Sequence, residues 1–417
     1  MLTKAALTAF LSTIGATHAL VCKYRTLFVA DSGNNCIRKI SEATGYVYTI
    51  AGSSTAGFQD GYSPRFYTPQ GVAVSPDGSL LYIADKGNSR IRKLNIQTGL
   101  VTTLAGNGMG PFSDGIGYRD GVGTSALFSS PLDVAITSDG STLYVSDNFG
   151  GMVRSITTSS GQTSTVAGNA GTGFKDGAAA TAQFGMIMAV CVSPDGKTVY
   201  VADWYNGAVR AVNLQTKVVS TLAKFGSPSG LSISLDGAFL YVSDQLSNCI
   251  RRVNPTNSFV STLSGSCGSI IGSTDGAFYA AQFFSPSGIS LSRDGLTLFV
   301  ADYGNSAIRA IDPATGTTST FAGRLTGGLV DGPLLSAGFR FPNAVAVNPC
   351  QSPGGFLFPD ASVLIRVRIA CSVQLGPSAG WHSQGPGDSE KLCRRNNLMN
   401  ILILRVRCRS WGIPTSQ

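Results

Sequence analysis

The chain of 417 residues is rich in glycine, with 51 Gly, and only 13% of its residues are charged. This composition excludes a charge-rich disordered chain and favours short strands joined by tight turns over a helical protein. The formal charge of +8 is concentrated in residues 351–417, which hold eight Lys and Arg against three acidic residues. The rest of the chain is nearly neutral, so we expect no nucleic-acid partner.

The first 19 residues are typical of a secretory signal. Lys4 precedes an apolar stretch over residues 5–16, and Thr17 and Ala19 place small residues at the positions preferred before a cleavage site. We therefore predict a signal peptide over residues 1–19 and a secreted or extracellular protein, with an unstructured start or a strand fragment as the alternative. No other apolar run approaches the roughly 18 residues of a membrane helix, so we expect no membrane span.

Six times in the chain, an Asp that ends an apolar strand is followed seven residues later by an Arg. The copies recur at intervals of 41 to 62 residues, so each is one supersecondary unit that must stack on its neighbours. The Asp suits the start of a tight turn, and the Arg across the hairpin is placed to reach that carboxylate or a carbonyl of the neighbouring unit. We interpret these repeated pairs as structural: Asp31/Arg38, Asp85/Arg92, Asp147/Arg154, Asp203/Arg210, Asp244/Arg251 and Asp302/Arg309. Residues three positions after the Asp are expected to tolerate left-handed geometry in four copies: Asn34, Asn88, Asn206 and Asn305.

The second unit shows the plan of one repeat. Short apolar segments at 71–74, 81–84, 91–94 and 101–104 are separated by turn residues, which predicts a four-stranded antiparallel propeller blade. The chain begins on a second strand at 27–30 and ends on a first strand at 344–347. We therefore predict an all-β, six-bladed propeller over residues 20–349, closed by pairing of these two segments.

A seventh blade is the alternative to six. Residues 356–360 followed by Ile365 and Arg366 resemble a decayed pair of strands. We interpret residues 350–417 as a degenerate repeat remnant followed by a basic, Cys-containing and poorly ordered tail, or as the product of a shifted reading frame. The sequence leaves these alternatives open.

The second unit, residues 69–93, resembles the NHL repeat. Its Gly-Val-Ala-Val-Ser-Pro-Asp-Gly segment and its Leu-Tyr-Ile-Ala-Asp segment, followed by Gly-Asn and Ile-Arg-Lys, carry the resemblance, which extends over about residues 24–349. The resemblance implies a six-bladed propeller and a surface that binds other macromolecules, without identifying them.

The connections between units carry Asp-Gly pairs, each usually followed by a Phe shortly before the next unit. An Asp-Gly turn with a hydrophobic plug explains this pattern. The alternative is a ring of carboxylates on one face that presents oxygens to a cation or a partner. The candidate binding residues on this face are Asp60, Asp114, Asp176, Asp275 and Asp331.

Few residues are available for enzyme chemistry. The only histidines are His18 and His382, outside the repeats, which excludes His-held zinc and Ser-His-Asp or Cys-His nucleophiles in the propeller. Nine cysteines without CxxC spacing leave their pairing open. We predict a non-enzymatic scaffold for a protein or small-molecule ligand, with no cofactor, metal or catalytic residue. The alternative is a calcium-dependent hydrolase similar to gluconolactonase or strictosidine synthase, although no Glu lies between Glu42 and Glu390.

Overall fold

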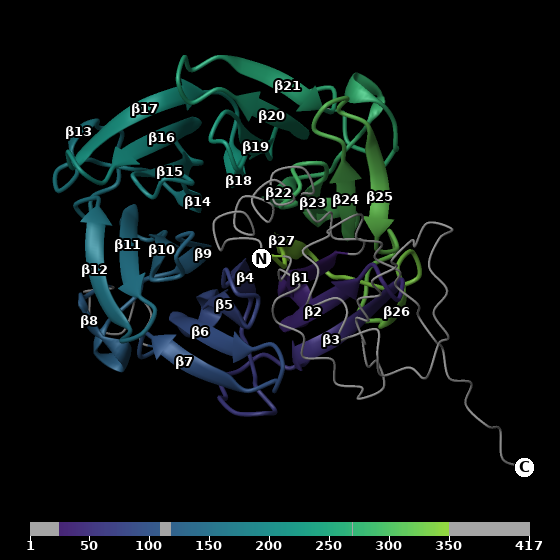
Figure 1. The fold of residues 1–417 in the computed structure, drawn as a ribbon, viewed down its shortest axis with the longest axis horizontal. Helices are drawn as coiled ribbons and strands as arrows, with labels where there is room; N and C mark the ends of the chain where they lie inside the picture. The colour runs from purple at the N-terminus through teal and green to yellow at the C-terminus, as the bar shows by residue number, and fades with distance from the viewer. Residues whose placement is uncertain (1–24, 109–117, 269, 350–417) are drawn as a thin grey trace, which may run out of the picture. The chain divides into compact units, whose positions relative to one another are not determined.

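The computed structural model describes residues 25–108, 118–268 and 270–349, all within one unit of the chain, Met1–Ser352. The predicted signal at 1–19 and the predicted tail at 350–417 lie outside the described residues. The described residues form six antiparallel sheets that follow one another around a ring (Figure 1). The predicted six-bladed propeller is confirmed.

Each blade contains four main strands, named here first to fourth from the axis outward. Three of the blades carry a short fifth strand on the outer edge, contributed by the connection that precedes the blade. Blade 1 comprises β27 (Pro342–Val347), β1 (Thr26–Asp31), β2 (Cys36–Ser41), β3 (Tyr46–Gly52) and the short β26 (Gly332–Pro333). Blade 2 comprises β4 (Pro69–Val74), β5 (Leu80–Asp85), β6 (Arg90–Asn95) and β7 (Val101–Ala105). Blade 3 comprises β9 (Pro131–Ile136), β10 (Thr142–Asp147), β11 (Met152–Thr157), β12 (Gln162–Ala167) and the short β8 (Gly121–Val122).

The remaining blades follow the same order. Blade 4 comprises β14 (Ile187–Val192), β15 (Thr198–Asp203), β16 (Ala208–Asn213), β17 (Val218–Lys224) and the short β13 (Gly177–Ala178). Blade 5 comprises β18 (Pro228–Ile233), β19 (Leu240–Asp244), β20 (Cys249–Val253) and β21 (Val260–Ser264). Blade 6 comprises β22 (Pro286–Leu291), β23 (Leu298–Asp302), β24 (Ala307–Ile311) and β25 (Thr318–Ala322).

The helices of the described residues are single 3₁₀ turns, and none has the length and apolarity to cross a membrane. They are η1 (Ser32–Asn34), η2 (Lys86–Asn88), η3 (Gly123–Ser125), η4 (Phe278–Ala280) and η5 (Tyr303–Asn305). Three of them, η1, η2 and η5, form the turn between the second and third strands of blades 1, 2 and 6.

The two ends of the repeat region close the ring. β1 pairs antiparallel with β27 in the register Leu27 to Val347 and Ala30 to Ala344, which is the pairing predicted from the strand count. Blade 1 is therefore assembled from both ends of the propeller, and its second strand has a partner on each side.

Hydrophobic residues fill the spaces between neighbouring blades. In each blade the aromatic residue of the second strand is at most 8% exposed and belongs to an apolar cluster shared with an adjacent blade. These residues are Phe28, Tyr82, Tyr144, Tyr200, Tyr241 and Phe299. First strands approach closely near the axis: a Cβ placed on Gly71 of blade 2 would lie 2.4 Å from the Asp133 Cα of blade 3. Small residues on the first strands are thus required by close packing.

The left-handed residue of the turn after the second strand lies one position later than the sequence suggested. Asn35, Ser89 and Ser306 have φ values of 49° to 55°. The preceding residue, Asn88 in blade 2, instead donates its side-chain amide to Asp85 at 2.8 Å. The expectation of left-handed geometry at the earlier Asn was wrong because that side chain is needed to hold the Asp.

Candidate functional site

The connections between blades and the turns between second and third strands lie on the same face of the propeller. Second and fourth strands run in the same direction, so they end on one face, which we call the insert face. The opposite face carries the turns between first and second strands and between third and fourth strands.

In all six blades an Arg of the third strand donates a hydrogen bond to the Asp that ends the second strand. In blade 2, Arg92 Nη1 lies 2.7 Å from Asp85 Oδ2, and neither side chain is exposed. Burial raises the pKa of Asp85 although Asn88, the Tyr67 N–H and Arg92 all hold its carboxylate. In blade 3 burial raises the pKa of Asp147 to about 6, against the charge of Arg154 and two backbone N–H groups. In blades 1, 2, 3, 4 and 6 both side chains of the pair are at most 1% exposed, so these five pairs lie inside the blades.

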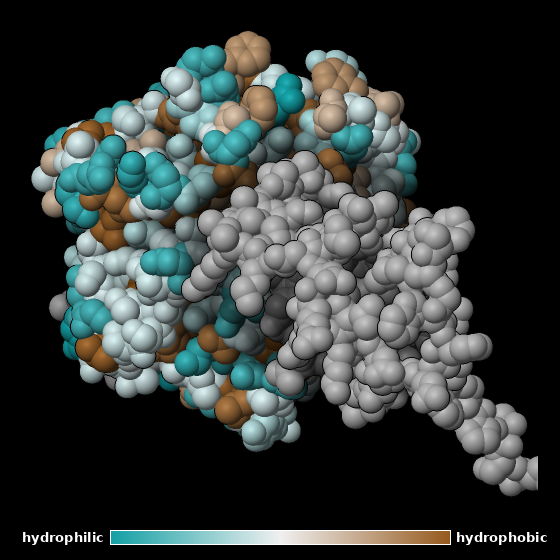
Figure 2. All heavy atoms as spheres, viewed as in Figure 1, coloured by the Kyte–Doolittle hydropathy of each residue, from teal (hydrophilic) through white to brown (hydrophobic). Residues whose placement is uncertain are grey.

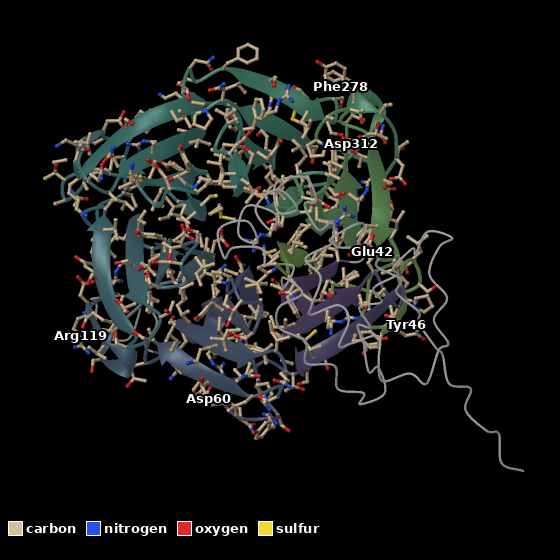
Figure 3. All side chains as sticks on the ribbon, in the orientation of Figure 1. Glu42, Tyr46, Asp60, Arg119, Phe278 and Asp312 are labelled. Atoms are coloured by element: carbon tan, nitrogen blue, oxygen red, sulfur yellow. A yellow bond between two sulfur atoms is a disulfide. The ribbon has the colours of Figure 1, made fainter. Side chains whose placement is uncertain are left out.

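In five blades the same Arg also binds a second Asp, contributed by the connection that precedes the blade. In blade 2, Arg92 Nη2 lies 2.6 Å from Asp60 Oδ1, and the N–H of Thr103 on the fourth strand donates to Asp60 Oδ2 at 3.1 Å. The connection is thereby fixed across the outer edge of its blade, and Figure 3 shows Asp60 at the outer side of blade 2, next to β7. The equivalent acidic residues are Asp120, Asp176, Asp275 and Asp331, bound to Arg154, Arg210, Arg309 and Arg38.

The predicted ring of carboxylates is thus distributed over separate blade edges. Asp60, Asp176, Asp275 and Asp331 each bind an Arg and a Thr of one blade. Burial alone would raise the pKa of Asp176, but hydrogen bonds from Arg210 and Thr221 outweigh it and lower that pKa. Asp114 lies outside the described residues, and Asp120 occupies the equivalent position in blade 3. Within the described part of the chain, no three His, Cys, Asp or Glu side chains gather as a metal site.

A buried Phe completes each of these five clusters. The Phe66 ring is not exposed, and its centroid lies 5.2 Å from the Arg92 guanidinium carbon. Phe128, Phe184, Phe283 and Phe339 are placed in the same way, with distances of 5.0 to 5.3 Å. The hydrophobic plugs predicted from the sequence therefore also contact the buried guanidinium groups.

Blade 5 lacks the insert. Only residues 225–227 separate β17 from β18, which is too short to cross the outer edge of the blade. Arg251 therefore binds Asp244 through Nε at 3.2 Å and Thr262 Oγ1 through Nη1 at 3.0 Å, with no acidic partner from a connection among the described residues. Its side chain is 22% exposed, whereas the equivalent Arg is 0–1% exposed in the other blades.

A second asymmetry divides the insert face into two halves. The residue two positions after the Asp of the second strand is Gly33, Gly87 or Gly304 in blades 1, 2 and 6. Each donates its N–H to a carbonyl of the preceding connection at 2.8 Å, and an added Cβ would lie 2.4 to 2.6 Å from that connection. Only glycine fits beneath the large residues of these connections.

In blades 3, 4 and 5 the same position carries Phe149, Tyr205 and Leu246, which are 52%, 75% and 62% exposed. Here the residue immediately after the Asp donates the backbone hydrogen bond, and the connection carries the small residues Gly185 and Gly226 in blades 4 and 5. We call Phe149, Tyr205 and Leu246 the apolar row. The Trp204 Nε1–H donates to Gln245 Oε1 at 2.9 Å and so links the turns of blades 4 and 5.

The axis holds a small cavity beside one acidic side chain. The cavity has a volume of about 40 Å³ and is lined by first-strand residues that include Asp133, Ser229 and Asn343. Burial raises the pKa of Asp133 to about 7, although the Val190 N–H donates to its carboxylate. The space is suitable for water and is far smaller than the pockets that usually bind drug-sized ligands.

The sequence profile of the NHL repeat matches residues 66–94, which extend from the buried Phe66 through the Asp85/Arg92 pair of blade 2. The chain is a six-bladed β-propeller that contains an NHL repeat. It is 31% identical over 194 residues to Protein SUPPRESSOR OF QUENCHING 1, chloroplastic, of Arabidopsis thaliana, and the aligned region covers 45% of this chain and 18% of that protein. It is 28% identical over 200 residues to NHL repeat-containing protein 2 of Homo sapiens, and the aligned region covers 46% of this chain and 27% of that protein. The NHL chain therefore spans about a fifth to a quarter of the length of these relatives.

Solved structures share the fold of the NHL chain. One is described as the nidogen/laminin complex, with a TM-score of 0.54, 14% identity, and coverage of 78% of this chain and 98% of that chain. Another is a protein of unknown function from Bacteroides thetaiotaomicron, with a TM-score of 0.57, 20% identity, and coverage of 78% and 85%. At these identities the similarity concerns the fold alone.

The sequence left the pairing of the cysteines open. A disulfide joins Cys249 at the start of β20 to Cys267 just after β21, with a sequence separation of 18. Cys36 occupies the same repeat position as Cys249 and is a free, buried thiol. The equivalent of Cys267 in blade 1 is Ser54, so blade 1 has no sulfur partner at that position.

Proposed function

We propose that this chain is an exported, non-enzymatic scaffold that binds a protein partner through the apolar row on blades 3 to 5. The observation that supports this function is the asymmetry of the insert face. Three consecutive blades present large apolar side chains at a turn position where the other three require glycine. A structural role shared by all blades would not produce this division.

The turns that carry the apolar row are well suited to binding. Tyr205 and Leu246 stand on short turns whose backbones are hydrogen-bonded to the preceding connections, and Trp204 joins the two turns. A rigid aromatic side chain contributes a large contact area at a low cost in conformational entropy, and aromatic anchors dominate many protein interfaces. A chain with this fold also occurs in a structure described as a complex of nidogen with laminin, which is consistent with a binding role.

Site-specific photo-crosslinking would test this function. A benzoylphenylalanine is introduced in place of Tyr205 or Leu246, and in control proteins in place of Leu235 or Leu296. The controls are 62% and 60% exposed but lie in turns on the opposite face. We expect the same partner to be captured from both row positions and from neither control.

The variant Y205S/L246S provides the matching loss of function, with L235S/L296S as its control. We expect the first pair to release the captured partner and the second pair to retain it, while both melt within a few degrees of the parent protein. Capture that is equal on the two faces, or unchanged in Y205S/L246S, would show that the apolar row is not the binding surface.

A further inference from the structure

The outer edge of blade 5 is the part of the propeller that departs most from the repeat. In four other blades a residue of the connection pairs with the first or second residue of the fourth strand, and in blade 6 Gly276 and Thr318 exchange both backbone hydrogen bonds. Blade 5 has no such segment among the described residues. We call the unpaired outer edge of blade 5, with the side chains of Phe225, Arg251, Val260 and Thr262, the blade 5 slot.

The backbone of β21 presents unused hydrogen-bonding groups to this slot. The Asn254 N–H donates to the Phe259 carbonyl at 2.9 Å, just as the Asn95 N–H donates to the Leu100 carbonyl in blade 2. This register turns the N–H and C=O of Val260 toward the open edge, as it does for Val101. In blade 2, Val101 exchanges both bonds with Gly61, whereas no described residue bonds to Val260 on that side. An edge strand of this kind is a template for another strand.

The side chains of the slot are also less covered than their equivalents. Val260 and Phe225 are only partly buried, although Val101 and Phe66 are completely buried at the same positions. Arg251 has no described partner on Nη2, the atom that binds the insert Asp in the other blades. Exposed Phe259, at 65%, flanks the strand, and Figure 2 shows apolar side chains protruding from the outer rim in this region.

Blade 4 shows what such a slot holds. Gly177 pairs with Val219, and Asp176 accepts hydrogen bonds from Arg210 and from the Thr221 N–H and hydroxyl. The Phe174 ring lies 4.6 Å from the Arg210 guanidinium carbon. Similar segments in other blades are Phe58-Gln-Asp60-Gly61, Tyr118-Arg-Asp120-Gly121 and Leu329-Val-Asp331-Gly332. The pattern shared by these four inserts is an apolar residue, any residue, Asp and Gly, and the insert of blade 6 keeps the Asp and Gly with Ser273 at the apolar position.

We propose that the blade 5 slot binds an extended segment of a partner protein with this apolar-x-Asp-Gly pattern. The segment adds a strand to β21, its Asp accepts hydrogen bonds from Arg251 and the Thr262 N–H, and its apolar residue covers the guanidinium. Main-chain pairing provides affinity and the Asp provides specificity through a charge-assisted bond. The Cys249–Cys267 disulfide borders the slot, because Cys267 Sγ lies 3.4 Å from Thr262 Oγ1. This site is separate from the apolar row and does not depend on it.

The test uses a labelled peptide with the sequence of residues 171–179 and the full chain, measured by fluorescence anisotropy. A tethered insert has an effective concentration of about millimolar, so the chain is titrated up to that range into a fixed, low concentration of the labelled peptide. We expect saturable binding that weakens at least about 10-fold when the peptide Asp is replaced by Asn, or when Arg251 is replaced by Gln. Arg252→Gln is the matched control, since Arg252 is the adjacent residue and contacts Phe239 instead. It should bind the peptide as the parent does.

Two further variants address the backbone and the geometry. Val260→Pro removes the outward N–H without removing a bond to β20, and it should weaken peptide binding. Inserting a copy of residues 169–183 between Lys224 and Phe225 supplies the missing segment within the chain, since these residues lead from the end of the fourth strand to the Phe in blade 4. It should abolish peptide binding while the protein stays folded by circular dichroism.

Several results would overturn the proposal. These are the absence of saturable binding, binding that Arg251→Gln leaves unchanged, and peptide binding that survives the added insert. Dimerisation of the parent protein that the added insert abolishes would identify a second copy as the occupant and would also overturn it. The Y205S/L246S variant should bind the peptide normally, so failure of the apolar row and failure of the slot are distinguishable.

Discussion

Replacing Arg92 by Met should destabilise the propeller by more than replacing Arg251 by Met. Arg92 donates five hydrogen bonds, to Asp85, Asp60 and the carbonyls of Gln59 and Arg65. Arg251 donates two. Both changes leave a buried Asp without its cation, a cost of about 3–5 kcal/mol that is common to the two variants. The three additional hydrogen bonds of Arg92 add about 2 kcal/mol.

Urea unfolding followed by circular dichroism measures this difference. We expect the free energy of unfolding to fall by about 5–7 kcal/mol for R92M and about 3–5 kcal/mol for R251M. Because a six-bladed ring need not unfold in one step, limited proteolysis provides a local measure. R92M should become sensitive to cleavage within residues 53–66, whereas R251M should not. A cost for R251M equal to or above that of R92M would refute the argument that the Arg holds the insert to its blade.

Three further predictions concern other parts of the fold. Burial raises the pKa of Asp133 to about 7, so its ionisation costs stability increasingly from about pH 4 up to about pH 7. D133N should therefore raise the free energy of unfolding by up to about 4 kcal/mol at pH 8 and have little effect at pH 4. Equal effects at both pH values would contradict the raised pKa. G87A should cost about 1–3 kcal/mol in urea unfolding because its Cβ would meet Tyr67 at 2.5 Å, whereas G268A, with open space around it, should be neutral. C267S should lower stability by about 3 kcal/mol through loss of the disulfide loop, and an unchanged unfolding midpoint would show that the bridge contributes nothing.

The sequence was sufficient to predict most of the fold, because the repeat encodes it several times over. Alternation of apolar residues defined the strands, and the constant spacing of Asp85 to Arg92 and its equivalents defined the turns. The closure of Leu27 against Val347 followed from counting strands. Such features depend on local chemistry that every blade shares.

The candidate site was less predictable because it depends on the differences between blades. Asp114 was chosen as the insert carboxylate of blade 3, but Asp120 binds Arg154. The separation of 34 residues between Asp176 and Arg210 is the same as that between Asp120 and Arg154, and this signal was present in the sequence. In blades 1, 2 and 6 the turn carries Gly and the connection carries the large residue, whereas in blades 4 and 5 the turn carries the large residue and the connection carries Gly. The arrangement depends on which backbone N–H of the turn bonds to the connection, and only the structure shows this.

The short connection before blade 5 was also visible in the sequence, as the interval of 41 residues between Asp203 and Asp244. Its consequence was not, because the covering of a blade edge by the preceding connection is a tertiary arrangement. The repeated Asp and Arg therefore identify the blades, and the open edge lies where one repeated part is missing.

Amide hydrogen exchange at single-residue resolution most directly tests the central claim, which is that blade 5 alone among the described blades has no backbone-paired segment over its outer edge. In blade 2 the Val101 N–H donates to the Gly61 carbonyl and the Thr103 N–H donates to Asp60. We predict that the amides of Val260 and Thr262 exchange at least about 100-fold faster than those of Val101 and Thr103, because no described residue accepts a hydrogen bond from them at the outer edge. Equal protection of the two pairs would contradict the open edge and the binding slot inferred from it.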